Sequence, residues 1–206
     1  MTEAIAISPL SHREPDPAGE DSLIAITEIV GRGMIDLKVQ PSDRSACDAV
    51  REVLGFDLPS TPRSSSRKGE RAALWLSIDQ HLIITPIAEC ETQIEALNTA
   101  LNGHVAAVTD LSDARAVIRL SGPGASDVIR KGSQADIGGS GPDAGTVSRM
   151  PLAGIPAVVH MVQSGSEIID LYVDRSYGES AWEWLARAAR KEAELRVFTK
   201  QQEPPV

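Results

Sequence analysis

Aromatic and basic residues are scarce in this chain of 206 amino acids. Three Trp, two Tyr and two Phe make up 3% of it, and 20 Lys and Arg stand against 29 Asp and Glu, so the net charge is −9. So few aromatics argue against a base-stacking surface or a large aromatic-lined pocket, and the acidic balance argues against a binder of the phosphate backbone. No apolar run approaches the roughly 18 residues of a membrane span. We therefore expect neither a nucleic acid nor a membrane as a partner.

Signals for secretion and for metal binding are also missing. Glu3 stands where a secretory signal carries Lys or Arg, and the apolar patch beside it is short, which predicts a cytoplasmic protein. Cys47 and Cys90 form no C-x-x-C pair, and in a reducing compartment we expect two small buried thiols. The histidines are too widely spaced for a zinc site: His12, His81, His104 and His160. The sequence therefore predicts no metal site.

Stretches rich in Pro, Gly and Ser divide the chain. We expect residues 1–20 to form a flexible N-terminal arm and residues 196–206 a similar C-terminal tail. Residues 58–70 and 138–145 have the composition of turns and are expected to be exposed loops. The remaining residues, 21–195, are predicted to form a single domain.

Apolar periodicity predicts both strands and helices within this domain. Gly31-Arg32-Gly33 is typical of a hairpin turn and would join strands at 23–30 and 34–39. A helix is predicted between Asp43, as its N-cap, and Gly55. Further strands are expected at 72–78, 82–87, 104–111, 114–121, 146–152, 155–162 and 167–173, and further helices at 92–101, after Pro123 in a first-turn position, and from a capping box at 176–179.

Two parts of the chain resemble each other. Residues 34–60 align with residues 115–139. We infer an internal duplication with half-repeats at about 21–103 and 104–195, each with the order β-β-α-β-β-α. Strand pairs followed by helices predict an α+β fold, in which helices pack on mostly antiparallel sheets.

Two glycine-rich segments carry partial dinucleotide-binding patterns. The segment 121–127 (SGPGASD) follows a predicted strand and precedes a helix, where backbone N–H groups can bind a phosphate. It lacks the third glycine of the fingerprint, Pro123 removes one donor, and the helix is short. The pattern at 139–144 leads into a strand instead of a helix. We therefore interpret both segments as turns.

Candidate acid–base residues lack the partners that catalysis needs. Asp110 and Asp113 have the spacing of a carboxylate pair, but such residues more often hold a turn, and no His or Lys lies near them in the sequence. His104 and His160 stand in strand-like segments and are expected to be core or edge residues.

The remaining basic candidates are isolated. Arg149 and Arg175 have the charge to bind an anion, although arginines near strand ends are ordinary surface residues, and the serine-rich segment 64–68 is expected to be solvated. On these grounds we predict no catalytic, cofactor-binding or metal-binding residues in this chain.

Four of the seven aromatic residues lie between positions 172 and 184: Tyr172, Tyr177, Trp182 and Trp184. The two tryptophans are about 200° apart around a helix, so both cannot face the same core. Tryptophan is enriched at interface anchors. We treat the segment as a candidate docking surface, with a partly exposed Trp on a monomer as the alternative.

Three blocks of sequence resemble the gamma subunit of heterotetrameric sarcosine oxidase. They are DLSDAR (110–115), LSGPG (120–124) and DLYVDRSY (170–177), and the resemblance spans roughly 21–195. The family's fold resembles the N-terminal, folate-binding module of the glycine-cleavage T-protein, which agrees with the duplicated strand–helix unit.

The resemblance implies a subunit of a complex that oxidises sarcosine or a related N-methyl amine. Such a complex has alpha, beta, gamma and delta chains, carries FAD, FMN and NAD, and passes the one-carbon unit to tetrahydrofolate, with the cofactors on the alpha and beta chains. The gamma chain would then be non-catalytic, bind no cofactor and contribute to packing and assembly. The alternative is a stand-alone protein of the same fold that binds tetrahydrofolate or transfers one-carbon units.

Overall fold

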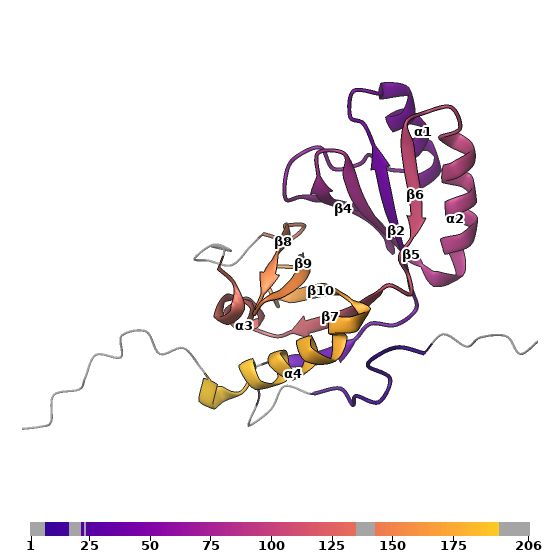
Figure 1. The fold of residues 1–206 in the computed structure, drawn as a ribbon. Coiled ribbons are helices and arrows are strands. Elements are labelled where there is room, and N and C mark those ends of the chain that lie inside the picture. The colour runs from indigo at the N-terminus through magenta and orange to yellow at the C-terminus, as the bar shows by residue number, and fades with distance from the viewer. Residues whose placement is uncertain (1–6, 17–21, 23, 135–142, 194–206) are drawn as a thin grey trace, which may run out of the picture.

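The computed structural model describes residues 7–16, 22, 24–134 and 143–193 (Figure 1). These residues form ten strands, four α-helices and two 3₁₀ turns: β1 (Ala25–Glu28), β2 (Arg32–Val39), α1 (Arg44–Leu54), β3 (Ser65–Lys68), β4 (Arg71–Ser77), β5 (Gln80–Pro86), α2 (Ile87–Ala100), β6 (Ala106–Asp110), β7 (Arg115–Ser121), α3 (Ala125–Gly132), β8 (Val147–Leu152), β9 (Ile155–Gln163), β10 (Ile168–Asp174), η1 (Arg175–Tyr177), α4 (Gly178–Ala188) and η2 (Lys191–Ala193).

The described strands form two five-stranded sheets with the same internal order. The first sheet runs β3-β4-β5-β2-β6 and the second runs β8-β9-β10-β7-β1, with antiparallel neighbours throughout. Each strand of one sheet therefore has a counterpart at the same place in the other, and each half has the order β-β-α-β-β-β-α, one strand more than the predicted β-β-α-β-β-α. The predicted α+β fold with antiparallel sheets is confirmed.

The two halves exchange their first strands. β1 pairs with β7 at the edge of the second sheet, and β6 pairs with β2 at the edge of the first. The predicted hairpin at Gly31-Arg32-Gly33 is therefore wrong, because β1 and β2 lie in different sheets. Gly33 serves packing instead of a turn: a Cβ atom there would lie 2.6 Å from Cβ of Cys90 on α2.

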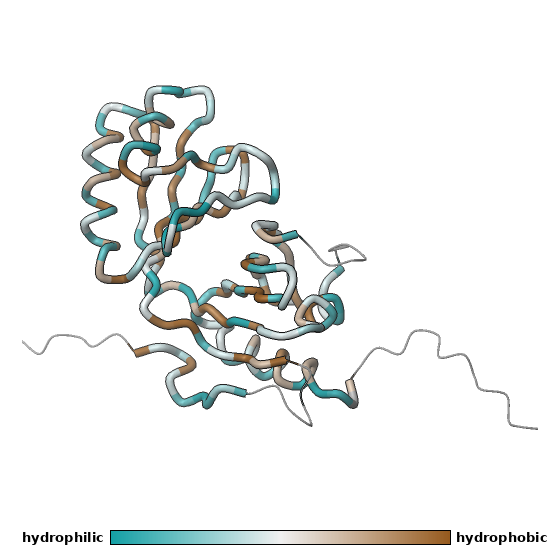
Figure 2. The backbone as a smooth tube through the Cα atoms, turned by 180° about the vertical axis from the view of Figure 1, so that it is seen from behind, coloured by the Kyte–Doolittle hydropathy of each residue, from teal (hydrophilic) through white to brown (hydrophobic). Residues whose placement is uncertain are grey.

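Helices cover the outer face of each sheet, and the inner faces turn toward one another (Figure 1). α1 and α2 pack on the first sheet around Ile35, Leu37 and Leu97, and α3 and α4 pack on the second around Ile118 and Leu171. A third apolar cluster lies between the sheets, in what we call the intersheet layer, and includes Met34, Leu74, Leu82, Val117, Val158 and Tyr172. In Figure 2 hydrophobic segments accordingly alternate with hydrophilic ones along the helices and strands.

The first helix follows the sequence prediction. The Asp43 side chain accepts a hydrogen bond from the backbone N–H of Ala46, which caps α1, and Gly55 ends it with a φ of 79°. Thus local capping chemistry places both ends of this helix.

The later helices differ from the prediction at their starts. α2 begins at Ile87, before the expected position 92. The capping box predicted at 176–179 is wrong: a 3₁₀ turn precedes α4, and its N-cap, Tyr177, makes no side-chain capping bond. Glu179 pairs with Arg13 and His12 of the N-terminal segment.

Two segments expected to be irregular are ordered. Within the predicted flexible arm 1–20, Leu10 is fully buried against the second sheet's core and Asp16 bridges Ile26, so residues 7–16 pack on the domain. Within the predicted loop 58–70, residues 65–68 form β3, an edge strand. Of the predicted loop 138–145, only residues 143–145 are among those described.

None of the described helices has both the length and the apolar character needed to span a bilayer.

Candidate functional site

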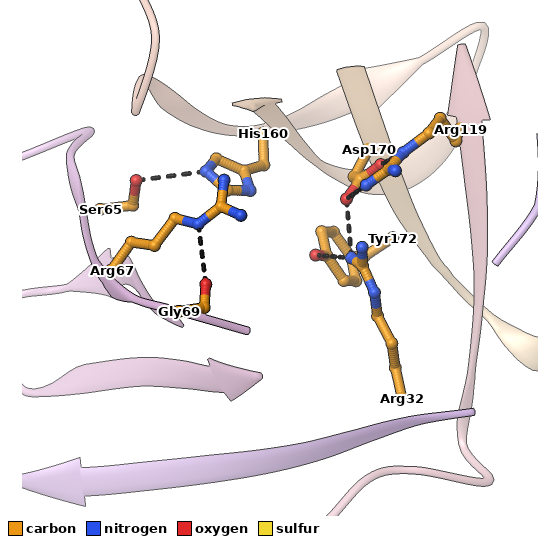
Figure 3. Close-up of polar contacts among 8 residues, drawn as sticks. All are labelled: Arg32, Ser65, Arg67, Gly69, Arg119, His160, Asp170 and Tyr172. Atoms are coloured by element: carbon orange, nitrogen blue, oxygen red, sulfur yellow. Dashed lines mark hydrogen bonds and ion pairs between the residues drawn. The ribbon is translucent and has the colours of Figure 1, made fainter. Parts of the chain in front are cut away.

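A cluster of polar side chains lies in the intersheet layer (Figure 3). Arg119 on β7, Asp170 on β10 and His160 on β9 are direct cross-strand neighbours, so they form one row on the inner face of the second sheet. Tyr172 follows Asp170 by two positions on the same strand and therefore shares that face. The first sheet contributes Arg32.

Asp170 is the only carboxylate among the described residues that is buried, with 1% of its surface exposed. It accepts hydrogen bonds from Arg119 (Nε to Oδ1, 2.7 Å; Nη2 to Oδ2, 3.0 Å) and from Arg32 (Nη1 to Oδ2, 2.6 Å). Burial alone would raise the pKa of Asp170, but the hydrogen bonds and charges of Arg119 and Arg32 hold it below its ordinary value. The carboxylate is therefore ionised and already paired with two guanidinium groups.

Arg32 joins the two sheets. It reaches from β2 to Asp170 and also donates to the hydroxyl oxygen of Tyr172 at 2.9 Å. Burial raises the pKa of Tyr172. Tyr172 is therefore a neutral phenol at physiological pH, positioned between an apolar core and a charged network.

His160 forms a second link between the sheets. Its Nε2 lies 3.2 Å from Oγ of Ser65 on β3, and the Ser65 hydroxyl donates to the carbonyl oxygen of Gly145. The Ser65 oxygen is thus an acceptor for the Nε2–H of His160, and Nδ1 is buried without a partner among the described residues. Burial, reinforced by nearby arginines, lowers the pKa of His160 to about 4. His160 is therefore neutral at pH 7.

Beyond Tyr172, at the other end of this inner face, lies a cavity of about 490 Å³. Its walls come from the second sheet: Arg115, Arg149, Met150, Pro151, Pro156, Ala157, Val158, Tyr172 and Asp174. Within the described part of the chain, the side chain of neither arginine makes a hydrogen bond or an ion pair. Burial lowers the pKa of Arg115, although Asp174 and Asp36 oppose this effect at a distance.

The two ends of the inner face therefore differ in chemistry. The Asp170 end has its charges paired, which suits a structural link and leaves no free carboxylate for proton transfer. At the cavity end, no described residue accepts a hydrogen bond from the side chain of Arg115 or Arg149, so their donors can bind an anion. The sequence contained a sign of the Asp170 cluster, since Arg119 and Asp170 each interrupt an apolar strand. A charged residue in such a strand does not reveal which residue it pairs with.

Of the two carboxylates suggested for acid–base work, Asp110 holds a turn and Asp113 faces solvent. Asp110 accepts hydrogen bonds from the backbone N–H and the hydroxyl of Ser112, at 2.8 and 2.6 Å, and Asp113 is exposed. His104 lies 2.7 Å from an oxygen of Asp43, at the start of α1. These residues do not converge on the intersheet layer.

The glycine-rich segment at 121–127 is a turn into α3, as predicted. Gly122 and Gly124 have φ values of 129° and 105°. The backbone N–H groups of Gly124 and Ser126 donate to a carboxylate oxygen of Glu167, at 2.9 and 3.1 Å. The chain's own acid thus occupies the place that a phosphate would take in a dinucleotide site. The segment 139–142 lies outside the described residues.

The thiols and potential metal ligands are dispersed. Cys90 is buried, as predicted, whereas Cys47 is only half-buried. Across the described ranges, no three His, Cys, Asp or Glu side chains gather as metal ligands would. Arg175 donates to the carbonyl oxygen of Ile7, which fastens the N-terminal segment to the start of α4.

The aromatic segment 172–184 is mostly interior, which corrects its interpretation as a docking surface. Tyr172 and Trp182 are 1% and 4% exposed. Trp184 is half-buried and packs on α3, so that a Cβ atom at Gly132 would lie 2.6 Å from its ring. Tyr177 alone among the four is exposed, at 41%.

Known proteins of similar sequence include two sarcosine oxidase gamma subunits. The subunit from Corynebacterium sp. (strain P-1) is 32% identical over 142 residues, which is 68% of each chain, and that from Arthrobacter sp. is 33% identical over 115 residues, 55% of each. The aligned region thus spans about half of the Arthrobacter protein's length.

Solved structures of similar fold also include a chain of a sarcosine oxidase. A chain of the heterotetrameric sarcosine oxidase from Corynebacterium sp. U-96, in complex with pyrrole 2-carboxylate, matches with a TM-score of 0.80 and 25% identity, covering 93% of this chain and 98% of that one. Aminomethyltransferase T of the glycine cleavage system from Bartonella henselae matches with a TM-score of 0.60 and 13% identity, over 78% of this chain and 44% of that one, which confirms the T-protein-like fold. The model of the sarcosine oxidase, gamma subunit family matches residues 38–191, and the chain belongs to that family.

Proposed function

We propose that this chain is a gamma subunit of a heterotetrameric sarcosine oxidase and that it contributes to assembly instead of to the chemistry. The observation that carries the proposal is the likeness to one chain of such an oxidase, over 93% of this chain and 98% of that one. The complex would oxidise sarcosine or a related N-methyl amine. Its other members would be alpha, beta and delta chains.

The cofactors of the complex would be bound by other chains. FAD, FMN and NAD carry phosphates, and at the glycine-rich entry to α3 the N–H groups of Gly124 and Ser126 are already taken by Glu167. Tetrahydrofolate presents the N–H donors of its pterin ring, which call for a free buried carboxylate. Asp170, the buried carboxylate among the described residues, already has its charge paired with Arg119 and Arg32. The entry to α3 therefore does not suit a cofactor phosphate, and Asp170 does not suit a pterin ring.

An exposed apolar groove supports the role in assembly. Ile7, Val30 and Ile87 are 62%, 70% and 50% exposed, and all three line a groove of about 300 Å³ where β2 begins and β5 ends. Exposed apolar side chains that gather in one place favour a protein–protein contact. We infer that a partner subunit covers the groove.

The test is co-expression of this chain with its alpha, beta and delta partners, followed by affinity purification and measurement of the native mass. We expect the four chains to elute together. Val30→Glu combined with Ile87→Glu should release the gamma chain, because it places two charges in the covered groove. Ile78→Glu is the matched control: Ile78 is 73% exposed at the opposite end of the first sheet, after β4. A gamma chain that stays monomeric beside its partners would overturn the proposal.

The alternative is a stand-alone protein that binds tetrahydrofolate, favoured by the fold shared with aminomethyltransferase T. It predicts that the isolated chain binds tetrahydrofolate in a calorimetric titration. Absence of heat at millimolar concentration would exclude it. The two hypotheses are thus separated by two measurements, one on assembly and one on ligand binding.

A further inference from the structure

We propose that the cavity lined by Arg115 and Arg149 is a binding site for a small monocarboxylate. The inference does not depend on the subunit role, because every wall of the cavity belongs to this chain's second sheet. It rests on the position, the pairing and the net charge of the residues that line it.

The register of the sheet aims both arginines at the same space. Arg149 on β8 faces Val158 on β9, which faces Tyr172 on β10, so these three side chains form one row on the inner face. Arg115 on β7 stands opposite Asp174, one inner-face position further along the sheet. The two arginines are thus separated by three strand spacings, roughly 15 Å, with Val158 and Tyr172 between them. Long guanidinium side chains can close on a ligand lying over that floor.

The pairing of the inner-face arginines is uneven. Arg32 and Arg119 share the buried carboxylate of Asp170. Arg115 is half-buried, yet among the described residues no carboxylate comes within ion-pair distance of it, and burial lowers its pKa. A guanidinium withdrawn from water without an acceptor is unfavourable, and a bound anion supplies that acceptor.

The charge and size of the cavity define the class of ligand. Arg115 and Arg149 against Asp174 leave one net positive charge, which matches a monoanion. Met150, Pro151, Pro156, Ala157 and Val158 supply apolar walls. A volume of about 490 Å³ lies in the range of small-molecule sites. A planar fork of donors recognises a carboxylate in two-point contact. The site therefore suits a carboxylate attached to a small apolar group.

The test uses benzoate and its neutral isostere benzamide, titrated into the 206-residue chain by calorimetry and by NMR of the backbone amides. We expect benzoate to bind and to shift the amides of Ala157 and Val158. Benzamide has the same shape but no charge, and its affinity should be lower than that of benzoate by a factor of about ten or more. Equal binding of the two, or no binding of either at millimolar concentration, would overturn the proposal.

Two variants and a control separate the site from a general effect of charge. Arg149→Met should weaken benzoate binding about tenfold or more while keeping the fold, because Arg149 is exposed and its side chain contacts no carboxylate among the described residues. Arg115→Met should do the same, with the thermal midpoint recorded as a check on folding. Arg187→Met removes an exposed charge on α4 and should leave binding unchanged. An effect of Arg187→Met equal to that of Arg149→Met would contradict the assigned site.

The same titration on the co-purified assembly distinguishes the source of the carboxylate. Binding of benzoate that persists in the assembly supports a site for a small molecule. Binding that disappears there would overturn the small-molecule assignment, because a side chain of a partner would then fill the cavity.

Discussion

Substituting Asp170 by Asn should destabilise this protein more than any other single change of charge in the intersheet layer. The substitution preserves the shape of the side chain but removes the negative charge that Arg119 and Arg32 share. Loss of one partner of a buried ion pair costs about 3–5 kcal/mol, because the remaining charge stays buried. Both arginine side chains keep about a quarter of their surface in water, at 27% and 22%, so we expect the lower end, about 3 kcal/mol.

Urea unfolding followed by tryptophan fluorescence measures this loss. With a slope of about 2 kcal/mol per molar for a chain of this size, the midpoint should fall by about 1–2 M. Asp48→Asn is the matched control. It removes the same charge from a pair with Arg51 in which Asp48 is 60% exposed, and should change stability by less than about 1 kcal/mol.

A double variant tests the reason for the effect. Arg119→Met added to Asp170→Asn removes one of the two charges left without a counterion, so the combined loss should be smaller than the sum of the single losses. Additive losses would refute the argument that uncompensated charge is the cause. The pH dependence has a defined sign: the pKa of Asp170 is lower in the folded state, so its contribution is complete above about pH 4 and is lost as the pH falls through the folded-state value.

His160→Gln should flatten the pH dependence of stability between pH 6.5 and 4. The pKa of this histidine falls to about 4 on folding through burial, so the unfolded chain binds the proton first and the wild type loses about 1.4 kcal/mol per pH unit as the pH falls through that range. Urea midpoints across this range measure the effect, and an unchanged slope in His160→Gln would contradict this account. Gly132→Ala should lower stability by about 1–3 kcal/mol and alter the fluorescence spectrum, because the new methyl group meets an indole ring at 2.6 Å, whereas Gly165→Ala, with no atom within 4 Å, should do neither. Equal thermal midpoints for the two glycine variants would contradict this account.

Local chemistry made part of the fold predictable. The ends of α1 follow from Asp43 and Gly55, two residues that act on backbone groups within one helical turn. The strands β4 and β5 follow from apolar runs at 72–78 and 82–87 separated by a short polar turn. In each case the interacting groups are close in sequence, so composition and spacing carry the information.

Contacts between distant residues were not predictable. Arg32 and Asp170 are 138 positions apart, and the hydrogen bond between them depends on how the two sheets face each other. Tyr172 and Trp182 are residue types common at interfaces, yet both are interior. Tyr172 is buried in the intersheet layer, and Trp182 is buried between α4 and the second sheet. The edge strand β3 carries Ser65, Arg67 and Lys68 in place of apolar residues, because one of its sides has no neighbouring strand, and so it resembled a loop.

The exchange of β1 and β6 makes the intersheet layer a fixed part of the molecule. Each of these two strands is hydrogen-bonded to the sheet that the other half of the chain builds. Each sheet therefore contains one strand from the other half. Arg32 and Ser65 then clamp the layer through Asp170 and His160. Separating the sheets would therefore break these strand pairings and, at the same time, expose the buried ion pairs of Asp170 to water. The pairing of β7 to β10, β10 to β9 and β9 to β8 therefore fixes the backbone positions of the two arginines on either side of Val158 and Tyr172, so a ligand in the cavity has to order only their side chains.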